Sequence, residues 1–388
     1  MSDYDKSQFT PWRRPYKLQI DTTTYCNAKC PQCSRTNPSK GAFLSFRGKT
    51  LNNKGNRIFT GDLPLMHVKM EDFQRAYTEK TLSDIGYIQF CPTWGDHMMH
   101  PMALEMVEHV LSHSNHTIVE VVTNGSMRDE EWWWNFASLS YKYKPSRHSM
   151  TRKRLGVIFD VDGVDQEMHS RYRRNTDLSK VLAHMKVCSE FSSYLNVKSQ
   201  SILFEHNENY IEEIKELCKK HGSGTHTSVV SDRFVGAFTN NKDEFTFYDE
   251  NDERQVLKKA SRSFIDNFRK KDGARLLSGE ARLKEKIICG WSLNNNLNID
   301  FYGNVWPCCY FGNSHHNHNT FFMRQFMAQD YFKYNNNIFK NSLNEILKND
   351  WWKKLPETFN SSSPVRDCVH NCTSADKEGQ LRKYSDIT

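Results

Sequence analysis

Apolar and polar positions along the first two thirds of the chain alternate between strand-like and helix-like patterns. Short apolar runs predict strands at Tyr16–Thr23, Ile85–Phe90, Ile118–Val122, Leu155–Phe159, Val197–Leu203 and Thr225–Val230. Segments with helical apolar spacing lie between them, at Glu71–Lys80, Leu104–Leu111, Glu130–Leu139, Leu178–Phe191 and Ile211–Lys220. This repetition predicts parallel βαβ units. Six strands favour an α/β fold with a partial (β/α)6 barrel, similar to a TIM barrel; an open doubly wound sheet is the alternative.

The pattern changes twice in the last third of the chain. Residues 236–285 are charged and weakly patterned, and we interpret them as a connector with one or two helices. From residue 286 onward Asn, aromatic residues and Cys dominate, and Gly303-Asn304 indicates a hairpin turn. The sequence therefore predicts a core over 1–235, a connector over 236–285 and a small domain over 286–388.

Composition narrows the class of protein. The chain has 388 residues, a net charge of +7 and 26% charged residues, which we interpret as a solvated basic surface and not as a nucleic-acid footprint. The N-terminal segment MSDYDKSQFT has no apolar core of a signal peptide, and no apolar run is long enough to cross a bilayer. We expect a soluble, cytoplasmic protein without a membrane partner, in which the 11 cysteines serve metal binding more than disulfides.

The first cysteine cluster follows the first predicted strand directly. Cys26, Cys30 and Cys33 have the spacing C-x3-C-x2-C, and Pro31 stiffens the last turn. Three thiolates can hold three irons of a [4Fe–4S] cube and leave the fourth iron open for a ligand. A zinc knuckle is the alternative, although zinc sites usually take four ligands and no second pair at finger spacing lies nearby.

The run CNAKCPQCSR from Cys26 to Arg35 resembles the signature loop of the radical S-adenosylmethionine (SAM) enzymes. The resemblance implies that the open iron binds the amino and carboxylate groups of SAM. It also implies that one electron from the cluster cleaves SAM to a 5′-deoxyadenosyl radical, which abstracts hydrogen from a substrate. Gln32 departs from the superfamily, in which the position before the third cysteine is often aromatic.

Two later strand ends resemble SAM-binding motifs of the same superfamily. Gly95-Asp96 looks like the Gly–acid motif that holds the amino group of SAM, and the resemblance assigns that contact to Asp96. Asn124 is the central residue of a Thr-Asn-Gly sequence that resembles the TNG turn of these enzymes.

The fourth strand ends in a third such motif. The segment from Asp160 to Asp165, followed by Tyr172 and Arg173, resembles S-I-D-G-V-D and Y-R of peptide-modifying radical SAM enzymes, whose Ser and Arg contact the ribose and carboxylate of SAM. Arg173 matches this pattern and suits a carboxylate. Asp160 stands in place of the Ser and would repel the SAM carboxylate, so we expect it at the ribose hydroxyls.

A second cysteine cluster occupies the C-terminal part of the chain. The spacing from Cys289 through Gly303 to Cys308, with Cys368 and Cys372 following, resembles the auxiliary-cluster extension of SPASM/twitch radical SAM enzymes. The resemblance implies one auxiliary [4Fe–4S] cluster of the shorter twitch type, because the full SPASM pattern carries more cysteines. Cys309 competes with Cys308 as the ligand. A structural zinc site with four Cys ligands is the alternative.

Three hypotheses for function follow. The first is a radical SAM enzyme that abstracts hydrogen from a peptide or a small carbinol or sugar-like substrate. It would use SAM, two [4Fe–4S] clusters and a low-potential electron donor such as flavodoxin or ferredoxin. The second is an RNA- or nucleotide-modifying radical SAM enzyme, for which the sequence offers no RNA-binding module. The third is a non-catalytic iron–sulfur or zinc scaffold.

Overall fold

The computed structural model describes residues 15–33, 35, 64–91, 93–145, 153–231, 234, 243–249, 251, 253–261, 263–265, 287, 289–316, 330–362, 364–365, 368–369 and 372. Two compact units divide the chain. The core unit comprises Ile20–Ser261, and the terminal unit comprises Met1–Gln19 together with Arg262–Thr388. Each is described separately below.

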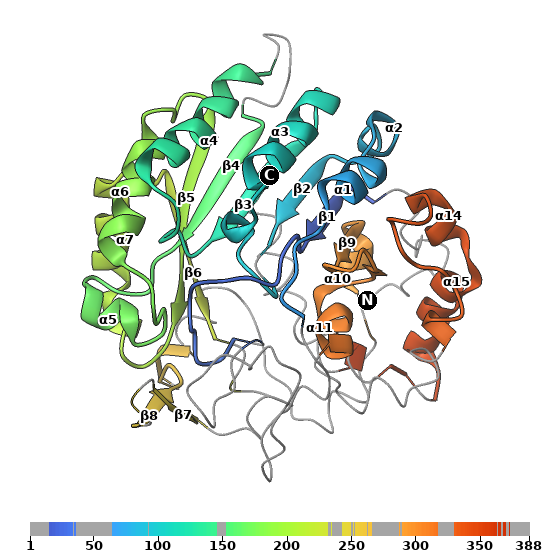
Figure 1. The fold of residues 1–388 in the computed structure, drawn as a ribbon. Coiled ribbons are helices and arrows are strands. Elements are labelled where there is room, and N and C mark those ends of the chain that lie inside the picture. Colours follow the sequence, from blue (N-terminus) through green and yellow to red (C-terminus); the bar gives the residue numbers. More distant parts are fainter. Residues whose placement is uncertain are drawn as a thin grey trace, which may run out of the picture. The chain divides into compact units, whose positions relative to one another are not determined.

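The core unit is an α/β fold around a parallel sheet, as the alternating pattern predicts (Figure 1). Its strands follow the chain order β2-β3-β4-β5-β6, and each neighbouring pair is parallel. Their bounds are β2 Tyr87–Phe90, β3 Ile118–Thr123, β4 Leu155–Asp160, β5 Leu195–Leu203 and β6 Thr225–Val230. The short strand β1, Lys17–Ile20, spans the boundary between the two units, and the Ile20 carbonyl accepts from the Cys91 amide, just past β2.

Helices pack along one face of this sheet. They are α1 Met70–Ala76, α2 Glu79–Leu82, α3 Ala103–His113, α4 Glu130–Lys142, α5 Gln166–Ser170, α6 Leu178–Ser189 and α7 Ile211–Lys220, with short 3-10 turns η2 His97–Met99 and η3 Glu208–Tyr210. α3 contacts β3, α4 and α6 contact β5, and α7 contacts β6. On β5 the helix-side residues are buried while alternate residues, such as Lys198 and Gln200, are partly exposed. This one-sided covering is the arrangement of a partial barrel and differs from a doubly wound sheet, which carries helices on both faces.

One local prediction is wrong. The helix predicted over Glu71–Lys80 is interrupted at Tyr77, because the Thr78 side chain caps a new helix, α2, by accepting from the Thr81 amide. The predicted connector over 236–285 also holds an antiparallel hairpin of β7, Glu244–Tyr248, and β8, Arg254–Lys258, while residues 263–265 are helical and most of the remaining connector lies outside the described residues. Alternate residues of this hairpin turn inward, so period-two burial outweighs its charged composition.

The terminal unit is built around a second hairpin. β9, Asn296–Ile299, pairs antiparallel with β10, Val305–Trp306, as the Gly303-Asn304 signal predicts. Gly303 has φ +83°, and a Cβ there would meet the Phe339 ring at 2.4 Å, so the turn requires glycine. The helices of this unit are α10 Gly290–Leu293, α11 Cys309–His316, α14 Leu343–Lys348 and α15 Asp350–Glu357, with the 3-10 turn η5 Thr358–Asn360.

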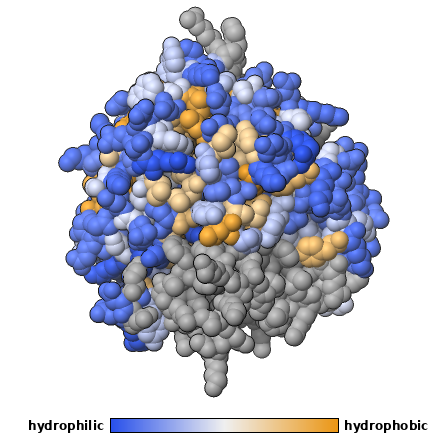
Figure 2. All heavy atoms as spheres, in the orientation of Figure 1, coloured by the Kyte–Doolittle hydropathy of each residue, from blue (hydrophilic) through white to orange (hydrophobic). Residues whose placement is uncertain are grey.

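The surface agrees with the charged composition. The face seen in Figure 2 is mostly hydrophilic, with apolar residues in small groups among polar ones. None of the described helices combines the length and apolar character that crossing a bilayer requires.

Candidate iron–sulfur and SAM site

The loop after β1 places the first three cysteines in or against one apolar cluster. Cys30 is buried, with 7% of its surface exposed, whereas Cys26 and Cys33 are half-buried and pack against the same cluster. The Cys33 amide donates to the Cys30 carbonyl at 3.0 Å, which closes the last turn of the loop. The structure therefore brings the three predicted thiols together.

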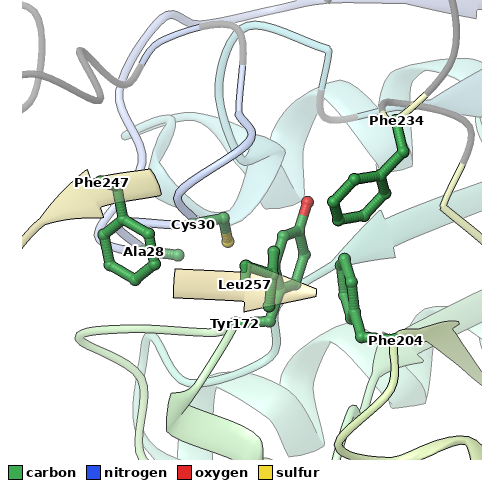
Figure 3. Packing of buried hydrophobic residues seen from close by; sticks show 7 residues of the cluster. All are labelled: Ala28, Cys30, Tyr172, Phe204, Phe234, Phe247 and Leu257. Carbon is green, nitrogen blue, oxygen red and sulfur yellow. The ribbon is translucent and has the colours of Figure 1, made fainter. Parts of the chain in front are cut away.

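The cluster around these thiols is rich in aromatic residues, which come from distant parts of the core unit. Its buried members are Ala28, Cys30, Tyr172, Phe204, Phe234, Phe247 and Leu257 (Figure 3). Phe247 and Leu257 come from the β7–β8 hairpin, which the sequence analysis did not connect with the site. This apolar surrounding limits the access of water to Cys30.

Burial makes the thiols weak acids in the absence of metal. It raises the pKa of Cys30 to about 12, against the opposing effect of the Arg173 guanidinium. Burial, followed by the charge of Asp96, also raises the pKa of Cys26, and the nearby Cys30 and Cys33 raise it further. Iron binds the deprotonated thiolate, so cluster assembly here must release protons.

Asp96 joins the loop after β2 to the turn after β3. Its Oδ1 accepts from the Met98 amide at 3.1 Å and from the Thr123 hydroxyl at 2.9 Å. Its Oδ2 accepts from the backbone amide of Asn124 at 2.8 Å and from the side-chain amide of Asn124 at 2.6 Å. An ionised carboxylate has about four acceptor positions, and these bonds use all four. The predicted contact between Asp96 and the SAM ammonium stays a prediction.

Gly95 and Asn124 hold the cysteine loop in place. A Cβ on Gly95 would lie 2.2 Å from the Thr23 carbonyl oxygen and 2.7 Å from that of Tyr25, so only glycine permits this backbone approach. The Asn124 side chain donates to Oδ1 of Asn27 at 2.9 Å and lies 3.7 Å from Sγ of Cys26. Two predicted SAM contacts thus border the cluster loop directly.

Arg173 is fixed by two buried carboxylates at the end of β4. Its Nη1 lies 2.9 Å from Oδ2 of Asp160, and its Nε lies 2.6 Å from Oδ2 of Asp162. Nη1 also lies 3.9 Å from Sγ of Cys30. Burial disfavours the guanidinium, but the two carboxylates outweigh burial and hold the pKa of Arg173 well above its ordinary value. Removing one member of such a buried pair typically costs about 3–5 kcal/mol.

The two carboxylates are themselves anchored by β5. Asp160 is opposite Gln200 in the parallel register, and Nε2 of Gln200 donates to its Oδ1 at 2.6 Å. The Ile202 amide donates to Oδ1 of Asp162 at 2.6 Å. Burial raises the pKa of Asp160 to about 6, although Arg173 opposes this shift. The predicted contacts of Asp160 with ribose and of Arg173 with the SAM carboxylate stay predictions.

Sequence reasoning missed two of these anchors. Asp162 lies within the motif at the end of the fourth strand, and the sequence analysis assigned it no function. Gln200 carried no signal, because only the register of β4 against β5 makes it a neighbour of Asp160.

These residues fit an iron–sulfur cube with one open iron. The site offers three thiols from one loop, an apolar surrounding, and N–H groups of Asn124 and Arg173 beside two of the sulfurs. In the described part of the chain, no three Cys, His, Asp or Glu side chains surround one ion position. A cube binds each thiolate to a separate iron, so the three thiols need not surround a single ion position. The fit therefore rests on their common position in or against one apolar cluster.

The second cysteine set surrounds a cavity in the terminal unit. Cys289, Cys308, Cys368 and Cys372 all line it, together with Pro307, Tyr310, Phe311, Leu355 and Phe359, and its space measures ≈ 290 Å³ with open solvent included. The structure thus brings the four predicted auxiliary ligands together. Cys308 lines this cavity, whereas Cys309 begins α11 and is absent from the lining of this cavity.

The thiols of this set interact strongly. Sγ of Cys289 accepts from the Ser292 amide at 3.4 Å, and the bond from the Cys372 thiol lowers the pKa of Cys289. Burial, with the charges of its cysteine neighbours, raises the pKa of Cys308 well above its ordinary value. Four thiols around one cavity, one of them already disposed toward thiolate, suit a bound cluster.

Comparison with known proteins concerns the C-terminal domain and the fold. Residues 289–373 match the family model SPASM, described as an iron-sulfur cluster-binding domain. Among solved structures, anSMEcpe with bound AdoMet and Kp18Cys peptide is similar, with 13% identity and a TM-score of 0.52 over 96% of this chain and 97% of that one. A second structure of anSMEcpe with bound AdoMet matches at 13% identity and a TM-score of 0.50, over 94% and 90% of the two chains. No curated protein sequence matches the chain.

These comparisons establish a fold and a C-terminal domain. The chain shares the fold of anSMEcpe, and the cysteine-lined cavity lies within residues 289–373, which match the SPASM iron-sulfur cluster-binding domain.

Proposed function

We propose that the chain binds SAM at a [4Fe–4S] cluster held by Cys26, Cys30 and Cys33 and uses it to abstract hydrogen from a substrate. The observation that carries this proposal is that the three thiols lie in or against one apolar cluster. Asn124 and Arg173, both from motifs that resemble SAM-binding ones, lie 3.7 Å and 3.9 Å from two of the sulfurs.

When bound, the cluster supplies the electron that cleaves SAM and so produces the 5′-deoxyadenosyl radical. The residues around it have separate roles. Gly95 allows the loop after β2 to approach the cysteine loop, and Asp96 locks the turn that carries Asn124. The apolar cluster around the thiols would lower the solvent exposure of the bound iron–sulfur cluster, which helps to set its reduction potential.

The auxiliary site supports a second function in the same reaction. Cys289, Cys308, Cys368 and Cys372 would hold one [4Fe–4S] cluster of the twitch type for electron transfer. The substrate is a peptide, or a small carbinol or sugar-like molecule; the peptide class is favoured because the similar fold of anSMEcpe is seen with a bound peptide. A low-potential donor such as flavodoxin or ferredoxin would supply the electrons.

The test is 5′-deoxyadenosine formation under anaerobic conditions. Reconstituted protein, reduced with dithionite and supplied with SAM, should form 5′-deoxyadenosine well above the level of a Cys30→Ala variant. Equal formation by the two proteins would overturn the proposal. With deuterated peptides and deuterated small alcohols offered separately, deuterium should enter 5′-deoxyadenosine from one class only, and reduced flavodoxin should replace dithionite.

A further inference from the structure

We propose that Arg173 acts on the SAM cluster through the sulfur of Cys30, and that Asp160 weakens this effect. The inference rests on the proposed function and assigns Arg173 and Asp160 as positioning residues that adjust the reduction potential of the cluster. The superfamily resemblance assigns both residues to SAM, and the observed contacts add a role at the cluster sulfur.

Geometry is the first argument, because the guanidinium is held on two sides. Nε donates to Asp162 at 2.6 Å and Nη1 lies 2.9 Å from Asp160, and both carboxylates are almost fully buried. Asp162 cannot turn away easily, since the Ile202 amide donates to its other oxygen and Asn207 donates to its backbone carbonyl at 3.0 Å. The two ion pairs therefore fix the position of the guanidinium beside Cys30.

The position of Nη1 is the second argument. Nη1 carries two hydrogens: one serves Asp160, and the other has Sγ of Cys30 at 3.9 Å. Hydrogen bonds and positive charge beside a cluster sulfur stabilise the reduced state, which carries one more negative charge. Arg173 therefore raises the potential of the cluster.

Charge balance gives Asp160 the opposite effect. Arg173 contributes one positive charge, while Asp160 and Asp162 contribute two negative charges within the same buried group. A serine at position 160, the residue of the resembling motif, would leave the group neutral. The aspartate makes it net negative and so opposes addition of an electron to the nearby cluster.

The test is a redox titration of the reconstituted full chain, followed by EPR in the absence of SAM. The signal of the SAM cluster is identified by its loss in Cys30→Ala and by its change when SAM is added to the wild type. Arg173→Gln should shift the reduced-to-oxidised ratio at fixed potential at least tenfold toward oxidised cluster, which is 59 mV for one electron. Asp160→Asn should shift the ratio in the opposite direction.

Matched controls lie on the exposed surface close by. Arg171 and Glu167 form an exposed ion pair at 3.4 Å, so Arg171→Gln and Glu167→Gln change the same charges where water screens them. Both controls should leave the potential unchanged. If Arg173→Gln does not fold, the opposite shift in Asp160→Asn decides the question.

The outcomes separate the two proposals. An unchanged potential in Arg173→Gln with weakened SAM binding would assign Arg173 to the SAM carboxylate and overturn the inference. Shifts of the same sign in both variants would overturn it as well. If wild-type protein shows no SAM-responsive signal, the proposed function itself fails, and the inference fails with it.

Discussion

At the scale of single residues, Gly95 has the tightest steric constraint near the cluster. Its missing side chain lets the backbone after β2 touch the carbonyls of Thr23 and Tyr25, a few residues before Cys26. The Asp96 amide donates to the same Tyr25 carbonyl at 2.8 Å. The position of Cys26 therefore depends on a contact that any Cβ would block.

Gly95→Ala should damage the SAM cluster selectively. Its Cβ would meet backbone atoms, which cannot move aside as a flexible side chain can, and such overpacking costs typically 1–3 kcal/mol or more. We expect roughly half the wild-type iron content after reconstitution and a loss of 5′-deoxyadenosine formation. Gly224→Ala is the matched control, because the nearest atom to a Cβ there is the Val197 carbonyl oxygen at 3.5 Å. Equal iron content in both variants would contradict the steric argument.

The cavity in the terminal unit also distinguishes two adjacent cysteines. Cys308 lines it and interacts with Cys289 and Cys368, whereas Cys309 is the first residue of α11. Cys308→Ser should therefore lower the iron content from about 8 to about 4 per chain, and Cys309→Ser should keep it at about 8, as expected for two [4Fe–4S] clusters. Iron and sulfide analysis of the two variants measures this, and the reverse result would assign the ligand to Cys309.

At the scale of elements, the parallel sheet could be predicted because each strand is a short apolar run between helical segments. Phe90, Val121, Val157 and Phe159 are fully buried, as such runs require. The β7–β8 hairpin could not be predicted in the same way. Most of its exposed positions are polar or charged, with Tyr248 and Val256 as exceptions, and the role of the inward-facing Phe247 and Leu257 depends on their packing beside Cys30.

The candidate site likewise has a part that the sequence predicts and a part that it does not. Its cysteines and strand-end motifs are local in sequence and were visible there. The donors to Asp96 and the carboxylates that hold Arg173 depend on register and on contacts across the sheet, such as Asp160 opposite Gln200. The sequence therefore predicted which side chains lie close together, but not which hydrogen bonds and ion pairs they form.

The 3-10 turn η2 contains the buried His97 and is followed directly by the buried His100, and both histidines stay neutral in the folded state. Burial lowers the pKa of His97 to about 3 and of His100 to about 4. Nδ1 of His100 accepts a hydrogen bond from the Met102 amide at 2.9 Å. Nε2 of the same ring then carries the proton and donates it to the Val68 carbonyl at 2.8 Å. Protonation at Nδ1 would break the bond from Met102.

The free energy of unfolding should therefore fall as the pH drops from about 6.5 towards 4. The unfolded chain takes up these protons near pH 6.5, the folded chain only near pH 3 to 4, so this stability is complete above pH 6.5. His100→Gln keeps a donor and an acceptor but cannot titrate, and should reduce the slope by up to about 1.4 kcal/mol per pH unit. Urea unfolding between pH 7.5 and 5.0 measures the slope, with exposed His116→Gln as the control. A slope like the wild type in His100→Gln would refute this account.

At the scale of the whole molecule, the two units differ in what stabilises them. The core unit has a parallel sheet with many fully buried residues, whereas the terminal unit packs a two-stranded hairpin and short helices around a cavity lined by four cysteines. A ligand that binds only the folded state adds to its stability. The terminal unit should depend more strongly on its cluster.

Removing the clusters by chelation should loosen the terminal unit first. Hydrogen–deuterium exchange should increase across residues 289–316 and 330–359, while β3, β4 and β5 keep most of their protection. Comparison of holo- and apo-protein by mass spectrometry measures this. Equal loss of protection in both units would show that the terminal unit has no special dependence on its cluster.

The terminal unit joins the two ends of the chain, and this has a consequence during synthesis. The Tyr16 amide donates to the Asn295 carbonyl at 2.8 Å, yet about 240 residues separate Gln19 from Arg262, where the unit resumes. At ~5–20 residues per second a ribosome needs about 12–50 s to make them. Throughout that interval the segment Tyr16–Lys17 lacks the Asn295 carbonyl that later accepts its amides. A chain that ended at Ser261 would contain every cysteine of the SAM site but not this partner of its first strand.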